Sequence, residues 1–200
     1  MMPRGGGWED TYARRAKKEK WLARSVYKLM EMDKKYKLIR PGDRLLDLGC
    51  YPGSWSQYSL KQVGPQGDVV GVDLQKPDHL LAPNFRFIEA DILSIDIEWL
   101  LEEIGLRDTV ISDMAPKTTG IHVADTSRSI ELAGSALKIA TSVLKERGHF
   151  VCKVFAGEDL NSYRDALSRY FSQVRSFRPS AVRKGSRETY ILGLKFKNQS

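Results

Sequence analysis

Cysteine, long apolar runs and the usual phosphate-binding glycine motifs are scarce or missing in this 200-residue sequence. The two cysteines, Cys50 and Cys152, show no metal-ligand spacing and are too few for a disulfide framework. No apolar stretch approaches the roughly 20 residues that span a bilayer. The first residues, Met-Met-Pro-Arg-Gly-Gly-Gly, lack the apolar core of a signal peptide. We therefore predict no metal site, no membrane association and a reducing, cytoplasmic setting.

Two glycine motifs that hold phosphates are also absent. No Gly-Lys-Ser/Thr triplet occurs, which argues against a P-loop. Gly49 and Gly53 are separated by Cys-Tyr-Pro, and no third glycine completes a dinucleotide fingerprint. Pro52 and Trp55 would also crowd a pyrophosphate resting on a helix N-terminus. A nicotinamide dehydrogenase is therefore disfavoured.

The excess of positive over negative charge is confined to one segment of the sequence. The net charge is +7, and residues 1–40 contain twelve Lys and Arg against five acids. The remaining residues balance at 20 basic against 20 acidic. A basic excess confined to one segment is typical of a surface that contacts nucleic-acid phosphates. A solvated helix face without a partner remains the alternative at this point.

Strands and helices are predicted to alternate after a basic helical segment. We predict a helix over 9–38, where Leu22, Val26, Leu29 and Met32 recur at helical spacing. The predicted strands are 44–48, 68–73, 85–90, 109–113, 148–155, 173–178 and 187–196, and the later helices are 54–63, 96–105, 124–146 and 158–170. Alternation predicts an α/β fold with a mostly parallel seven-stranded sheet and helices on both faces. The last two strands lack room for a crossover helix, so the last should run antiparallel. We expect one domain, 1–200, with a basic segment 1–40 and a Rossmann-like core 41–200, acting as a monomer.

Three aspartates are predicted at successive strand ends. Asp47 opens the turn that contains Gly49 and Gly53, two predicted ligand contacts because glycine lets the backbone approach a ligand closely. Asp73 ends the next strand, and Asp91 follows the third. Ligands of open α/β sheets bind at the carboxyl ends of the strands. S-adenosylmethionine fits acidic turns because it has no phosphates and carries an ammonium group. We predict Asp47 near that ammonium, Asp73 at the ribose hydroxyls and Asp91 at the adenine amino group, although each aspartate alone could be a turn cap.

Four charged residues occupy predicted strand ends or helix positions within apolar surroundings: Lys28, Asp113, Lys153 and Glu188. Lys153 lies inside His149-Phe-Val-Cys-Lys-Val-Phe155, where a lysine is costly unless it is paired or functional. A structural salt bridge is the alternative for Lys153. Lys28 alone could be an ordinary helix surface residue, and Glu188 an exposed strand end.

Five stretches of the sequence resemble the FtsJ/RrmJ family of ribosomal RNA 2′-O-ribose methyltransferases. They are Arg24-Ser-Val-Tyr-Lys-Leu29, Asp47-Leu-Gly…Pro52-Gly-Ser-Trp-Ser-Gln57, Ser112-Asp-Met-Ala-Pro116, Lys153-Val-Phe…Gly157 and Ser186-Arg-Glu-Thr-Tyr190. The resemblance implies a Rossmann-like S-adenosylmethionine-dependent methyltransferase fold and a catalytic tetrad of Lys28, Asp113, Lys153 and Glu188. It places the cofactor contacts at Gly53, Trp55, Asp73, Asp91 and Asp113. Tyr51 and Ser54 depart from the family's usual Ala-Ala-Pro-Gly-Gly pattern.

The resemblance implies methylation of a uridine ribose in 23S ribosomal RNA of the large subunit. A ribose 2′-hydroxyl is a weak nucleophile, so the protein must align it with the methyl donor and handle its proton. Lys153 is the candidate base or alkoxide stabiliser. Two rival functions remain: the same chemistry on a tRNA anticodon loop or an mRNA cap, and a non-catalytic RNA-binding assembly factor.

Overall fold

A seven-stranded sheet forms the centre of the computed structural model, which describes residues 9–116, 119–183 and 185–197. Its strands are β1 (Arg44–Leu48), β2 (Asp68–Asp73), β3 (Phe85–Glu89), β4 (Arg107–Ser112), β5 (Leu144–Phe155), β6 (Phe171–Phe177) and β7 (Glu188–Phe196). They are ordered β3-β2-β1-β4-β5-β7-β6, and β7 alone runs antiparallel to both neighbours. The predicted fold class, including the antiparallel last strand, is confirmed.

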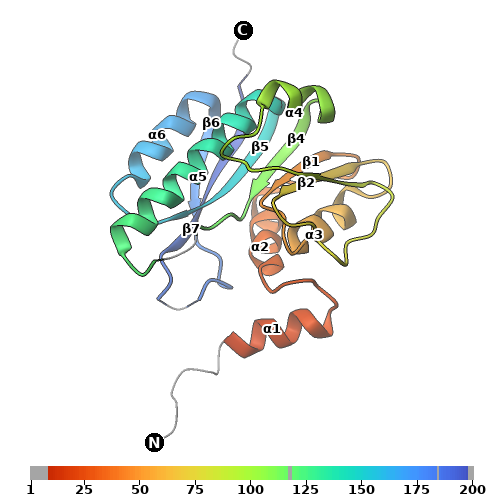
Figure 1. Cartoon of the computed structure of the whole chain (residues 1–200), viewed down its shortest axis with the longest axis horizontal. Helices are drawn as coiled ribbons and strands as arrows, with labels where there is room; N and C mark the ends of the chain where they lie inside the picture. Colours follow the sequence, from red (N-terminus) through yellow and green to blue (C-terminus); the bar gives the residue numbers. More distant parts are fainter. Residues whose placement is uncertain (1–8, 117–118, 184, 198–200) are drawn as a thin grey trace, which may run out of the picture.

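Helices cover both faces of the sheet (Figure 1). They are α1 (Glu9–Lys18), α2 (Val26–Tyr36), α3 (Ser54–Val63), α4 (Ile97–Ile104), α5 (His122–Val143) and α6 (Leu160–Tyr170). Helices α2 and α3 pack on one face, and α4, α5 and α6 on the other. None of the helices within the described residues has the length and apolarity required to cross a bilayer.

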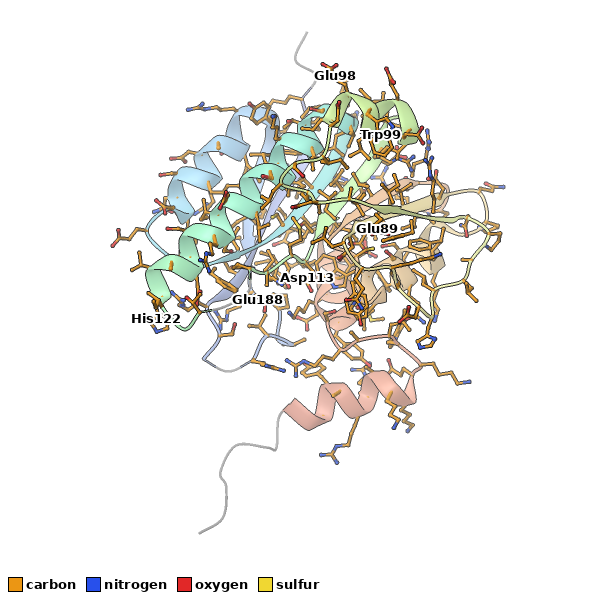
Figure 2. All side chains as sticks on the ribbon, in the orientation of Figure 1. Glu89, Glu98, Trp99, Asp113, His122 and Glu188 are labelled. Atoms are coloured by element: carbon orange, nitrogen blue, oxygen red, sulfur yellow. The ribbon has the colours of Figure 1, made fainter. Side chains whose placement is uncertain are left out.

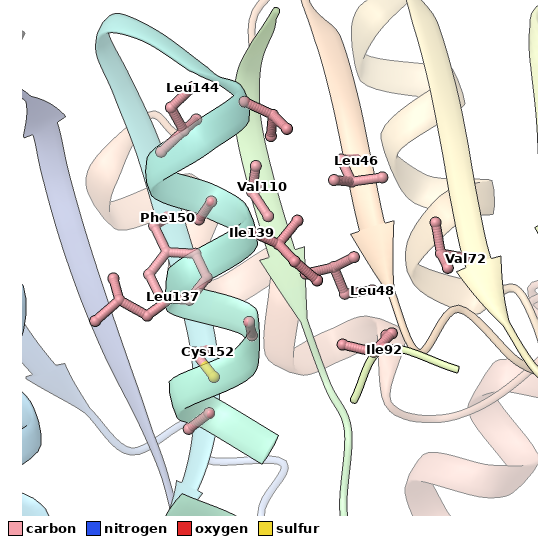
Figure 3. Close-up of a cluster of buried hydrophobic side chains, with 14 of the residues drawn as sticks. Leu46, Leu48, Val72, Ile92, Val110, Leu137, Ile139, Leu144, Phe150 and Cys152 are labelled. Carbon is pink, nitrogen blue, oxygen red and sulfur yellow. The ribbon is translucent and has the colours of Figure 1, made fainter. Parts of the chain in front are cut away.

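Alternating side chains of the central strands supply two separate cores. Leu46 and Leu48 of β1 belong to the core on the α5 side of the sheet, where Ile139 of α5 points toward Leu48 (Figure 3). Leu45 points to the opposite face of the sheet and belongs to the core under α2 and α3. Because successive strand residues face opposite ways, nearly continuous apolar strands can serve both cores. The carboxyl ends of β1, β2 and β4 are thereby held at one edge of a rigid sheet.

The predicted continuous helix over 9–38 is wrong, because the chain leaves the helix between α1 and α2. Lys20 adopts a left-handed conformation with φ 61°. The Gln57 side chain of α3 accepts from the Leu22 N–H at 3.0 Å and donates to the Lys20 carbonyl at 2.9 Å. These contacts come from a distant part of the sequence, so tertiary structure overrides the local helical pattern.

Smaller differences concern the ends of elements. The helix predicted over 124–146 is α5, which begins at His122 and ends at Val143. β5 then starts at Leu144, which pairs with Arg107, and the β4–β5 register shifts between Arg107 and Thr109. Residues 144–146, predicted to end the helix, therefore belong to the strand.

Candidate active site

A cavity of about 320 Å³ opens at the carboxyl ends of the strands. Four of the residues predicted from sequence to bind the cofactor line it: Gly49, Asp73, Asp91 and Asp113. Met114 and Leu132 add apolar surface, and Leu132 comes from α5. The cavity thus combines carboxylates from separate strand ends with apolar walls, as small-ligand sites commonly do.

Asp73 and Asp91 are oriented by backbone N–H groups. Asp73 accepts from the N–H of Tyr51 at 2.9 Å and from that of Gln75 at 3.1 Å. Asp91 accepts from the Leu93 N–H at 2.9 Å. A carboxylate has about four acceptor positions, so both side chains retain capacity for hydroxyl or amino donors of a ligand.

The turn after β1 depends on two glycines with positive φ. Gly49 has φ 75°, and a Cβ built there would lie 2.2 Å from the Met114 Cγ. Gly53 has φ 104° and stands at the start of α3, where an added Cβ would lie 3.0 Å from Leu22 Cδ1 and from Pro77 Cβ. Gly53 does not line the cavity, so its predicted cofactor contact stays a prediction.

Asp47 and Trp55 are both buried behind this turn. The Asp47 carboxylate is 1% exposed and accepts from the Ser56 Oγ at 2.6 Å. The Trp55 indole is 3% exposed, donates from Nε1 to the Ser25 carbonyl and lies beside the Tyr190 ring. Neither residue lines the cavity. Sequence reasoning did not single out Ser56, although it lies one residue beyond Trp55 on the same first turn of α3.

The four predicted catalytic residues form two ion pairs at the edge of this cavity. Lys28 Nζ lies 2.5 Å from Glu188 Oε1, and Lys153 Nζ lies 3.1 Å from Asp113 Oδ1. Lys153 also donates to the Asp113 carbonyl oxygen. Both lysines are only 8% exposed. The structure therefore brings α2, β5, β7 and the end of β4 together at one point; Asp113 and Glu188 are labelled in Figure 2.

Tyr190 joins the two ion pairs, and sequence reasoning gave it no role. Its hydroxyl lies 2.6 Å from Asp113 Oδ1 and 2.5 Å from Glu188 Oε1. Burial, and then the charges of Asp113 and Glu188, raise the pKa of Tyr190 well above its ordinary value. The hydroxyl consequently keeps its single proton and can donate it to one carboxylate at a time. The period of two along β7, which puts Tyr190 on the face of Glu188, is the signal that could have found it.

Lys153 has few hydrogen-bond partners within the described residues. An ammonium group has three N–H donors, and the bonds of Lys153 Nζ there go only to the Asp113 carboxylate and carbonyl. One donor direction remains for a substrate oxygen. In the same part of the chain no cluster of three or more His, Cys, Asp or Glu could hold a metal ion.

Comparisons with known proteins identify the family of this chain. The model of the family described as FtsJ-like methyltransferase matches residues 21–196. This chain belongs to that family. A ribosomal RNA large subunit methyltransferase E of Bdellovibrio bacteriovorus is 46% identical over 188 residues, covering 92% of this chain and 95% of the relative. The protein of the same name from Desulfosudis oleivorans is 44% identical over 191 residues, covering 96% and 92%.

Two solved structures have folds similar to that of this chain. A ribosomal RNA methyltransferase from Plasmodium falciparum superposes with a TM-score of 0.78 at 27% identity, covering 88% of this chain and 98% of that one. An rRNA-methylase structure from Clostridium thermocellum, at 18% identity and a TM-score of 0.57, covers 83% and 95% and supports the fold alone. The protein is thus an FtsJ-like methyltransferase whose ion-paired residues lie beside the acid-lined cavity.

Burial of Asp47 should make the stability of this methyltransferase depend on pH. Desolvation by burial raises the pKa of Asp47 from 3.8 to about 7, opposed by the Ser56 hydrogen bond and reinforced by the charges of Asp113 and Asp73. Between these two values the folded protein holds a proton that the unfolded chain has lost. The contribution of Asp47 to the free energy of unfolding should therefore fall as pH rises from about 4 to about 7.

Asp47→Asn should remove this dependence, because an amide does not ionise. The stability of the variant relative to wild type should increase by up to about 4 kcal/mol between pH 4 and pH 7. Urea unfolding at both pH values measures it, and Asp78→Asn, at an exposed position, is the matched control. A difference between Asp47→Asn and wild type that does not change with pH would contradict the assignment.

Proposed function

We propose that the protein transfers a methyl group from S-adenosylmethionine to the 2′-hydroxyl of a uridine in 23S ribosomal RNA of the large subunit. The main support for this proposal is a hydrogen-bonded network at the edge of an acid-lined cavity, formed by Lys28, Glu188, Tyr190, Asp113 and Lys153. The names of the relatives favour ribosomal RNA over a tRNA or an mRNA cap. We further propose that it acts as a monomeric single domain in the cytoplasm.

The cavity suits a cofactor that offers hydroxyl, amino and ammonium donors instead of phosphates. We propose that Asp73 accepts from the ribose hydroxyls and Asp91 from the adenine amino group, with Met114 and Leu132 against the apolar parts. Its volume is of the order expected for a small-molecule site. Asp47 is sealed behind the turn, so we propose that its carboxylate, in the ionised form, attracts the ammonium from behind Gly49.

Further cofactor roles rest on position in the fold. Gly53 would let the start of α3 approach the cofactor, and Trp55 would hold α3 against Tyr190 and Ser25. Bound S-adenosylmethionine would supply an electrophilic methyl group. The remaining chemistry falls to side chains of this protein.

Lys153 is the residue proposed to act on the ribose hydroxyl. Its Nζ is held by Asp113 through a carboxylate and a carbonyl oxygen. From there it would stabilise the developing alkoxide or accept its proton. Glu188 would fix Lys28, and Tyr190 would keep the two carboxylates at a constant separation. Such positioning favours in-line alignment of oxygen, methyl carbon and sulfur.

The proposed RNA surface combines α1 with the loop between β6 and β7. Figure 1 shows both on the side where the strands β1, β4 and β5 end. The Tyr12 hydroxyl of α1 lies 3.2 Å from Ser180 Oγ, and the Ser180 N–H donates to the Glu31 carboxylate of α2. Arg178 donates to the Ser186 and Glu188 carbonyls, so it braces the loop against the catalytic residues. Basic side chains of α1 would hold RNA phosphates above the ion pairs.

Replacing Arg14, Arg15, Lys17 and Lys18 with alanine should weaken RNA binding and flatten its salt dependence. Each phosphate neutralised on single-stranded RNA contributes roughly 0.7 to the slope of log affinity against log salt. Cofactor affinity should stay unchanged, since none of these side chains lines the cavity. Salt titrations of RNA binding compare wild type, this variant and a control with Lys138, Arg169, Arg175 and Lys197 replaced. Equal slopes in all three would rule out α1 as the phosphate contact.

Substrate class can be tested directly by methyl transfer. The protein and labelled S-adenosylmethionine are incubated with one RNA substrate in each reaction. The substrates are large subunits, small subunits, total tRNA and capped mRNA, each from a source lacking the modification. The proposal expects label in 23S RNA of the large subunit alone. Label confined to tRNA or to the cap would assign the rival substrates, and no label in any RNA would favour a non-catalytic role.

A further inference from the structure

A second, smaller cavity of about 190 Å³ lies on the other side of the catalytic residues. It is bounded by the start of α5 and the loop between β5 and α6, and its polar lining is His122, Thr126, Ser127, Glu158, Asp159 and Arg187. Arg187 directly precedes Glu188 of the ion-pair network. Figure 2 shows His122, Glu188 and Asp113 along the same end of the sheet. The cavity therefore adjoins the position proposed for the reacting ribose.

The walls of this cavity are fixed to one another. A Cβ on Gly157 would lie 2.4 Å from Thr126 Cγ2, so only glycine permits the observed approach of the loop to α5. The Phe155 N–H donates to Ser129 Oγ at 3.0 Å, and Arg187 Nη1 donates to Thr126 Oγ1 at 3.0 Å. The cavity is consequently a preformed feature of the fold, unlike a gap between independent loops.

Charges of both signs line the cavity without neutralising each other. Arg187 contacts only neutral oxygens within the described residues: Thr126 Oγ1 and, at 3.4 Å, the His122 carbonyl. Glu158 and Asp159 are exposed and have no ion-pair or hydrogen-bond partner for their side chains in that part of the chain, and Asp159 does not cap α6 with its side chain. An Arg donor set and two carboxylate acceptors are thus available to one ligand.

We propose that this cavity binds a guanine base adjacent to the methylated nucleotide, an inference that rests on the proposed RNA 2′-O-methylation. Guanine presents the acceptors O6 and N7, which arginine binds in bidentate fashion. Its Watson–Crick edge also carries neighbouring N1–H and N2–H donors, which match a carboxylate. RNA is usually read through such splayed, single-stranded bases.

Size and charge argue against other parts of the RNA. The volume is below the roughly 300 Å³ at which pockets for drug-sized ligands begin, so a single base suits it better than a whole nucleoside. Two carboxylates would repel a phosphate. Uracil offers only one N–H donor and would leave a carboxylate oxygen without a partner.

Binding of heptaribonucleotides tests the proposal. The probes are a uridine heptamer and versions with one guanosine or one inosine beside the central uridine, on either side. Inosine lacks the N2 amino group but keeps O6 and N7. Wild type should bind one guanosine probe roughly tenfold more tightly than the uridine heptamer, and the matching inosine probe at an intermediate level. Glu158→Gln and Asp159→Asn should reduce the preference for guanosine over inosine, and Arg187→Ala the preference for both over uridine.

Matched controls separate base recognition from general electrostatics. Glu131→Gln removes one exposed acid from α5 outside the cavity and should leave every ratio unchanged. Methyl transfer to large subunits is measured on the same preparations, and thermal melting verifies that Arg187→Ala folds. Absence of any guanosine preference, with methyl transfer intact, would overturn the cavity assignment alone. Equal weakening of all heptamers by Arg187→Ala would show that the arginine contacts phosphate and would also overturn it.

Discussion

Replacement of Lys153 by alanine is expected to abolish methyl transfer while leaving cofactor affinity nearly unchanged. Lys153 is 8% exposed, is paired with Asp113 and does not line the cofactor cavity. Loss of a positioned proton-transfer or charge-stabilising group typically costs about 10²–10⁴-fold in rate. Single-turnover methyl transfer and calorimetry of S-adenosylmethionine binding, on one preparation, measure the two quantities separately.

Lys145→Ala is the control for this result. Lys145 lies on the same strand, β5, and is likewise paired with a carboxylate, since its Nζ is 2.8 Å from Asp108 Oδ1. It lies near the opposite end of the strand, so its loss should leave turnover unchanged. Near wild-type turnover by Lys153→Ala would remove Lys153 from the mechanism. Equal losses in both variants would point to general destabilisation.

The second large effect is expected at Asp73, where alanine should weaken S-adenosylmethionine binding roughly 5- to 150-fold. This range corresponds to about 1–3 kcal/mol for a lost charged hydrogen bond. The carboxylate also accepts from the Tyr51 N–H, so part of the loss would come from loosening of the turn after β1. RNA affinity should barely change. Calorimetry with cofactor and a filter-binding assay with RNA measure the two affinities.

Glu89→Ala provides the comparison, because Glu89 is paired in register with Asp73 on the neighbouring strand but does not line the cavity. Its cofactor affinity should equal that of wild type. An unchanged cofactor dissociation constant in Asp73→Ala would mean that Asp73 only caps a turn. A weaker RNA affinity in that variant would place Asp73 on the RNA side.

Much of this architecture could be predicted from the sequence, because the relevant signals are local. Apolar strands that end in Asp73 or in the turn at Gly49 indicate both a parallel sheet and the edge where ligands bind. Lys153 could be recognised because a charged residue interrupts a strand buried on both faces. Helix α3 and strands β1 and β2 consequently have the predicted bounds.

The features that could not be predicted depend on contacts between distant segments. The break between α1 and α2 requires Gln57 to bind the backbone of Lys20 and Leu22, and no local pattern encodes that. Tyr190 looks like an ordinary strand aromatic until Asp113 is placed 2.6 Å from its hydroxyl. The burial of Asp47 behind Ser56 likewise depends on how α3 folds back over β1.

Alkaline hydrolysis of the methylated RNA tests the central claim most directly. Alkali cleaves RNA through the free 2′-hydroxyl, so a 2′-O-methyl group protects the adjoining phosphodiester bond. After transfer of labelled methyl groups to large subunits, we predict label in an alkali-resistant dinucleotide whose methylated ribose belongs to uridine. Label released entirely as mononucleotides would place the methyl group on a base and would contradict 2′-O-ribose methylation.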